Sequence, residues 1–170
     1  MSNMHANNEF NSIIKDYMNE EVLSLGKIPH HNSNRLNHSL KVSYYSYLIT
    51  KKLKLDYRST AIGGLLHDMY FNRVADMETK REKIKLFTSG HPKDALANAS
   101  NIFDLNDLQK NIIVSHMWPL SRELPKYKES FVVSVVDKCV STKEFGNKWH
   151  VKVSNTLGIY FILLVNLIFR

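Results

Sequence analysis

Apolar residues recur every three or four positions along much of the chain, a pattern typical of helices that bury one face. The first apolar stripe covers residues 10–22, and Gly26 followed by Pro29 ends it. A polar stretch at residues 30–34 leads into a second stripe over about residues 36–53. The pattern therefore predicts two amphipathic helices in the first third of the chain.

A third apolar run is short and ends at the dipeptide His67-Asp68. Ser59 or Thr60 is expected to cap this helix, because a hydroxyl can accept a hydrogen bond from the first helical turn. Charged residues dominate positions 76–85, which we expect to be exposed helix or loop.

Three further helices are predicted after residue 89. The first begins at Ser89-Gly90-His91-Pro92, since proline is tolerated at a first helical position. The second is capped by Asp104 or Asn106 and ends near His116. Two prolines bracket an irregular connection over residues 119–125, and the third helix covers about residues 130–145.

The fold class follows from these helices and from the scarcity of turn residues. Only six glycines and four prolines occur in 170 residues, which favours long helices over a many-stranded sheet. This length suits one domain. We predict a single all-α domain over residues 1–170, a compact bundle of about six or more helices with its core at about residues 30–146.

The end of the chain is a separate question. Residues 156–169 are nearly all apolar, interrupted by Gly158 and Asn166. This run is shorter than the roughly 20 residues of a membrane-spanning helix. We therefore expect a buried helix or a contact in a homo-oligomer rather than membrane association, although its composition also allows a terminal strand. The role of residues 151–170 stays open.

Charge and cysteine content narrow the partners and the compartment. The net charge of +7 favours anionic partners such as phosphate esters, although it could serve solubility alone. No nucleic-acid motif occurs, so specific nucleic-acid binding is not expected. Cys139 is the single cysteine and cannot form an internal disulfide. The N-terminus lacks a signal-peptide pattern, so we expect a cytoplasmic protein.

Candidate chemistry comes from an ordered set of imidazoles and carboxylates. Asp68 follows Leu65-Leu66, and Asp137 follows an apolar run at residues 132–136, so both carboxylates are expected to be buried. A buried aspartate requires a cation or several hydrogen-bond donors. A single histidine is more often a structural group, but four histidines with two such aspartates indicate a metal site. The six candidate ligands are His38, His67, Asp68, His91, His116 and Asp137.

Imidazole and carboxylate ligands without a thiolate suit iron, manganese, zinc, nickel or cobalt. They do not suit a structural zinc site of the cysteine type.

The ordered residues His38, His67-Asp68 and Asp137 resemble the H…HD…D signature of the HD-domain superfamily of metal-dependent phosphohydrolases. With His91 and His116 they resemble the longer pattern of its dinuclear members. The resemblance implies a first metal at the signature residues and a second metal at His91 and His116. Asp68 would bridge the two metals and position a metal-activated hydroxide. That hydroxide would attack a phosphoester or phosphoanhydride of a nucleotide or a similar small anion.

The sequence gives weaker evidence for functional residues other than the six candidate ligands. Arg35, Lys41, Arg122 and Lys126 are candidate phosphate contacts because they lie near His38 or His116 in the sequence, although each could be ordinary solvated charge. The pair His30-His31 is expected to be exposed and not to bind metal. The HD pair is followed by Met69-Tyr70-Phe71, whereas many dinuclear phosphodiesterases of this type have Ile-Gly there. This difference argues against close kinship with the cyclic-dinucleotide phosphodiesterases.

Two other functions are compatible with the same ligands. Some HD proteins with this ligand set are di-iron oxygenases, and ligand identity does not separate the two chemistries. A non-catalytic regulatory module that binds metal or nucleotide is the other alternative, and the apolar end of the chain would be its partner surface.

Overall fold

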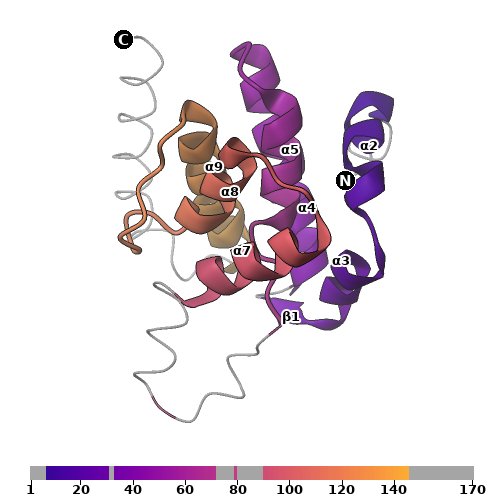
Figure 1. The fold of residues 1–170 in the computed structure, drawn as a ribbon, viewed down its shortest axis with the longest axis vertical. Coiled ribbons are helices and arrows are strands. Elements are labelled where there is room, and N and C mark those ends of the chain that lie inside the picture. Colours follow the sequence, from indigo (N-terminus) through magenta and orange to yellow (C-terminus); the bar gives the residue numbers. More distant parts are fainter. Residues whose placement is uncertain (1–6, 31–32, 72–78, 80–89, 146–170) are drawn as a thin grey trace.

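Five of the described helices begin at an asparagine or aspartate cap. The computed structural model describes residues 7–30, 33–71, 79 and 90–145 (Figure 1). In each of the capped helices the cap side chain accepts a hydrogen bond from a backbone N–H of the first turn, which satisfies a donor that lacks a partner within the helix. These caps are Asn7, Asn19, Asn34, Asp56 and Asn106.

The N-terminal apolar stripe forms two short helices. Helix α2 covers Asn8–Ile14 and continues as the 3₁₀ helix η1, Lys15–Tyr17; helix α3 covers Glu20–Ser24 and continues as η2, Leu25–Lys27. The prediction of one helix over residues 10–22 is therefore wrong. Asn19 has an extended backbone, and its side chain binds Val22 N–H, so a new helix starts inside the stripe.

A small hairpin replaces the expected polar link. Strand β1, Pro29–His30, pairs antiparallel with β2, Ser33–Asn34. The N–H of Arg35 also donates to the carbonyl of Ile28 at 3.0 Å, which folds the hairpin onto the start of α4.

Helices α4, Arg35–Lys52, and α5, Tyr57–Leu66, pack against each other, and α5 also contacts α2, α7, α8 and α9. The expected hydroxyl cap of α5 is wrong, because Asp56 caps the helix and accepts from Ser59 N–H at 2.9 Å. Helix α5 thus occupies the centre of the bundle (Figure 1). This central position of α5 places the dipeptide that follows it, His67-Asp68, in the interior of the bundle.

Helices α7, His91–Ile102, α8, Asp107–Ser115, and α9, Lys128–Phe145, complete the described bundle. Asn106 rather than Asp104 caps α8, in a reciprocal capping box with Gln109. The all-α prediction is confirmed. In the part of the chain that the structure describes, no helix is long and apolar enough to cross a membrane. The apolar end, residues 151–170, and nearly all of the charged segment, residues 76–85, lie outside the described residues.

Two adjacent glycines allow α5 to approach its neighbours closely. A Cβ atom at Gly64 would lie 3.0 Å from the Cα of Ser43 on α4. A Cβ atom at Gly63 would lie 2.8 Å from Ile112 Cγ2 on α8. The contact at Gly64 involves backbone, so it could be relieved only by moving α4 away from α5.

We expect Gly64→Ala to lower the free energy of unfolding by about 1–3 kcal/mol, the usual cost of overpacking. Gly26→Ala is the matched control, because its added Cβ would meet only the side chain of Leu36, at 3.6 Å. Urea unfolding of both variants measures the difference. Equal stabilities of the two variants would show that the helix contact at Gly64 is not tight.

The carboxylate of Glu9 adds polar contacts to the apolar packing of helix α2 against the bundle. Glu9 accepts hydrogen bonds from Tyr47 at 2.7 Å and from Tyr57 at 3.1 Å, and it also pairs with Lys51. The hydrogen bond from Lys51, followed by that from Tyr47, lowers the pKa of Glu9 from 4.5 to about 2.

Because the pKa of Glu9 is lower in the folded state, its stabilisation is complete above pH 4.5 and is lost as the pH falls toward about 2. Glu9→Gln should therefore be less stable than the wild type at neutral pH, and the difference should shrink in acid. Thermal unfolding across this pH range tests it. A difference in stability that stays constant with pH would contradict this account.

Candidate metal centre

The His67-Asp68 pair lies at the end of the central helix. Leu65 and Leu66 are fully buried, and His67 is the C-cap residue of α5. Its Nδ1 donates a hydrogen bond to the carbonyl of Gly64 at 2.8 Å. That bond fixes the neutral tautomer, so the lone pair on Nε2 is available to bind a cation.

His116 repeats this arrangement at the end of α8. It is the C-cap residue of that helix, and its Nδ1 donates to the carbonyl of Ile113 at 2.7 Å. In both helices the residue three positions before the histidine supplies the acceptor. Two neighbouring helices thus each present an Nε2 lone pair at their C-terminal ends.

His38, on α4, lies between two carboxylates of α9. Its Nε2 is 3.0 Å from Asp137 Oδ1, and its Nδ1 is 3.0 Å from Glu144 Oε2. Glu144 also pairs with Lys41 at 2.6 Å. A carboxylate behind a histidine orients the ring and raises its basicity as a metal ligand.

His91 is the first residue of α7 and completes the cluster. Its Nε2 is 3.0 Å from Nε2 of His116 and 3.6 Å from Asp68 Oδ1. His116 Nε2 is 3.5 Å from the same oxygen. These three atoms are as close to one another as the ligands of a single metal ion.

The structure brings all six predicted ligands together, with Asp68 in the middle. Asp68 Oδ2 is 3.8 Å from His67 Nε2, while Oδ1 faces His91 and His116. His67 Nε2 is also 3.8 Å from Asp137 Oδ1. The carboxylate of Asp68 therefore presents one oxygen to each of two neighbouring groups of ligands.

Two buried carboxylates, Asp68 and Asp137, set the electrostatics of the cluster. Burial would raise the pKa of Asp68 and of Asp137, but the neighbouring histidines hold both values well below the usual range. Burial would likewise lower the pKa of His38, yet its hydrogen bonds to Asp137 and Glu144 raise the value to about 10. The site therefore favours positive charge between its carboxylates, as a metal site should.

The donor atoms fit a metal. Among the described residues, neither His67 Nε2 nor Asp68 Oδ1 has a hydrogen-bond partner, although both atoms are buried. Such atoms are costly unless a ligand or ion satisfies them. Ligand atoms of His38, His67 and Asp137 lie within 4.8 Å of one another, as do those of His67, Asp68 and His116.

None of the four predicted phosphate-contact residues lines the cavity beside this cluster. Arg35 is buried and lies over the ring of Tyr70, with its carbon Cζ 3.6 Å from the ring centroid. Lys41 is paired with Glu144. Arg122 and Lys126 are exposed on the connection before α9. Sequence proximity placed these cations near the ligands but did not determine where their side chains point.

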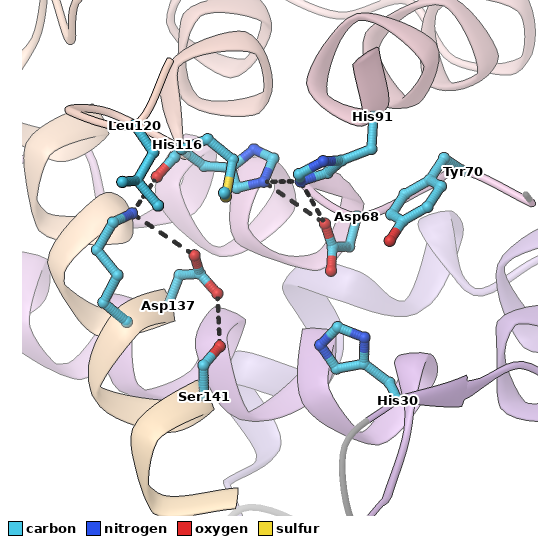
Figure 2. A pocket seen from close by; sticks show the side chains of 10 residues that line it. His30, Asp68, Tyr70, His91, His116, Leu120, Asp137 and Ser141 are labelled. Carbon is cyan, nitrogen blue, oxygen red and sulfur yellow. Dashed lines mark hydrogen bonds and ion pairs between the residues drawn. The ribbon is translucent and has the colours of Figure 1, made fainter. Parts of the chain in front are cut away.

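The cavity has a volume of about 280 Å³, which suits a small ligand. Figure 2 shows that His91, His116, Asp68 and Asp137 face into it. The remaining lining residues are His30, Tyr70, Met117, Leu120, Lys138 and Ser141.

His30 corrects one prediction. It is half-buried rather than exposed, and its ring centroid is 4.6 Å from that of His38. A nitrogen of His30 also lies within 4.8 Å of ligand atoms of His38 and Asp68. The β1–β2 hairpin, which the spacing of polar residues did not reveal, turns this residue toward the cavity. His31 lies outside the described residues.

Glu144 and Lys138 were missed by the sequence reasoning. Glu144 lies seven residues after Asp137, two helical turns along the same face, and this spacing could have found it. Lys138 is half-buried, and its Nζ donates to the carbonyl of His116 at 2.7 Å and to Ser134. Burial lowers the pKa of Lys138, although Asp137 opposes that shift. This lysine therefore fixes the backbone that carries His116.

A helical bundle that directs four histidines and two aspartates into its interior defines a metal-binding class of protein. A family model described as "HD domain" matches residues 35–141. The chain therefore belongs to the HD-domain family, a superfamily of metal-dependent phosphohydrolases, and the expected resemblance is confirmed. A search of curated proteins and a search of solved structures each returned no match.

We expect metal binding to depend on the carboxylate of Glu144. Glu144→Gln removes the charge behind His38 and should weaken metal affinity by about 10–100-fold, as loss of such a partner usually does. Glu129→Gln is the control, because Glu129 lies at the opposite end of α9 and accepts from the backbone of Asp56. Competition against a chelating dye measures the affinities. Equal affinities in both variants would contradict the role of Glu144.

Proposed function

We propose that this protein hydrolyses a phosphoester or phosphoanhydride bond of a nucleotide or a similar small anion, at a site that holds two divalent metals. The observation that carries the proposal is the position of Asp68. One of its oxygens faces His67 and the other faces His91 and His116. A carboxylate shared in this way is suited to bridge two metals.

On this proposal the six ligands form two sets. His38, His67 and Asp137 would hold one metal, and His91 and His116 the other, with Asp68 common to both. Iron, manganese, zinc, nickel and cobalt all suit these ligands. When bound, such metals polarise phosphoryl oxygens and lower the pKa of a coordinated water toward neutrality.

The protein's own contribution is to hold these groups in place before the substrate arrives. Hydrogen bonds to Gly64 and Ile113 fix the rings of His67 and His116. Glu144 fixes the ring of His38, and Lys138 fixes the backbone at His116. Groups that are already oriented need no reorganisation when charge develops in the transition state.

The cavity indicates a small substrate with an anionic end and an apolar end. The ligand cluster lies on one side, and Met117 and Leu120 form apolar parts of the lining. Leu120 is 63% exposed, so this part of the lining is open to solvent. The net charge of +7 favours the approach of anions. A nucleotide or another phosphorylated small molecule meets these requirements.

The number of metals provides the first test. Elemental analysis of the metal-loaded protein should give about two metals per chain, falling toward one in His91→Ala and in His116→Ala. Asp94→Ala is the control, since Asp94 is an exposed residue on the same helix as His91. One metal in the wild type and in both histidine variants would contradict the second metal site.

Activity provides the test of the reaction. The metal-loaded protein should release phosphate or a nucleotide product from a broad phosphoester panel, and Asp68→Asn should lower kcat by about 10²–10³-fold or more. Assays in manganese without oxygen distinguish hydrolysis from an oxygenase reaction. A fully metal-loaded protein that releases no product from the panel would refute the proposed function.

A further inference from the structure

An anion in the cavity requires hydrogen-bond donors as well as metals, and most donors on the lining are already occupied. The Nζ group of Lys138 donates to the carbonyl of His116 at 2.7 Å and to the carbonyl and hydroxyl of Ser134 at 3.2 Å each. The hydroxyl of Ser141 donates to Asp137 Oδ1 at 3.3 Å. Neither group can serve a substrate without giving up these bonds.

Tyr70 differs from Lys138 and Ser141 in the hydrogen bonding of its side chain. Only 3% of its surface is exposed, and it lines the cavity. Within the described part of the chain its hydroxyl makes no hydrogen bond to another residue. Figure 2 shows its ring beside Asp68, with the hydroxyl directed toward the space between Asp68 and His30. The hydroxyl lies on the lining of the cavity, where an atom of a bound ligand can accept its hydrogen bond.

Arg35 holds this tyrosine in place. Its guanidinium carbon lies 3.6 Å from the ring centroid of Tyr70, and its Nη1 donates to the backbone carbonyl of the same residue. Arg35 is itself 2% exposed, and the ring of Tyr70 also contacts His91 at a centroid distance of 4.9 Å. The hydroxyl therefore keeps one direction relative to the ligand cluster.

We propose that the hydroxyl of Tyr70 donates a hydrogen bond to an oxygen of the substrate's phosphoryl group, and that Arg35 is the residue that positions Tyr70. This inference rests on the proposed function, because it assigns a contact within the same site. It names a substrate-binding residue at the second position after the HD pair, where the sequence departs from the Ile-Gly of many dinuclear phosphodiesterases. The acceptor is an anionic oxygen, since the neighbouring groups are ligands for cations.

The test uses inorganic phosphate as the probe and metal-loaded full-length protein, with binding measured by calorimetry. Tyr70→Phe removes the hydroxyl and keeps the ring on which Arg35 rests. We expect the Kd for phosphate to rise about tenfold or more, the usual effect of losing a hydrogen bond to a charged group, with unchanged metal content. Tyr57→Phe is the matched control, because its hydroxyl binds Glu9 on the outer side of the bundle and its removal should not alter the Kd.

A second variant separates positioning from a general structural effect. Arg35→Met removes the guanidinium behind the ring and should also weaken phosphate binding. If Arg35 acts through Tyr70, the double variant should bind phosphate no more weakly than the weaker of the two single variants. Thermal melts establish that each variant is folded under the assay conditions.

The outcomes separate this inference from the proposed function. A Kd for phosphate in Tyr70→Phe equal to that of the wild type, at equal metal content, would overturn the role of Tyr70. Fully additive losses in the double variant would overturn the role of Arg35. Phosphate binding that depends on Tyr70 would support the inference even if no substrate in the panel were hydrolysed, a result that would count against the proposed function alone.

Discussion

The interior of this bundle contains two carboxylates that water barely reaches, and most of the site is organised around their charge. Asp68 is 4% exposed and Asp137 is 7% exposed. An isolated carboxylate in such surroundings costs several kcal/mol, which is recovered only through cations and hydrogen bonds of good geometry. Histidines from α4, α5, α7 and α8 meet this need by directing their Nε2 atoms toward the two aspartates. The helices are therefore held in register by the chemistry of the site as well as by apolar packing.

The helix α5 connects the packing of the bundle to the chemistry. Its glycines allow α4 and α8 to come close, and the same stretch ends at His67 and Asp68. The carbonyl of Gly64 also accepts the hydrogen bond that sets the tautomer of His67. One short segment thus determines how tightly three helices pack and which nitrogen of His67 faces the interior.

The sequence predicted the parts that depend on residue type and local spacing. The helices after residue 35 were placed within a few residues, because apolar residues recur at helical spacing and polar or turn residues separate the apolar runs. The six candidate ligands were identified because aspartates that follow buried apolar runs need a cation nearby, and the histidines supply the rest of a candidate metal site. The N-terminal helix was wrong because one asparagine cap inside an apolar stripe starts a new helix. The positions of His30, Arg35 and Tyr70 depend on the β1–β2 hairpin and on packing between α4 and the residues after α5, which the spacing of residues along one chain does not encode.

The ligands of this site come from segments that are far apart in the chain. His38 and Asp137, which are in contact, are separated by 99 residues. The complete set of ligands therefore requires α9 to be docked on α4. A cation bound here links the first long helix of the bundle to the last. Its binding energy adds to the stability of the whole cooperative unit. Amide hydrogen exchange that requires global unfolding should consequently slow throughout α4, α5, α8 and α9 together, rather than only in the residues beside the ion.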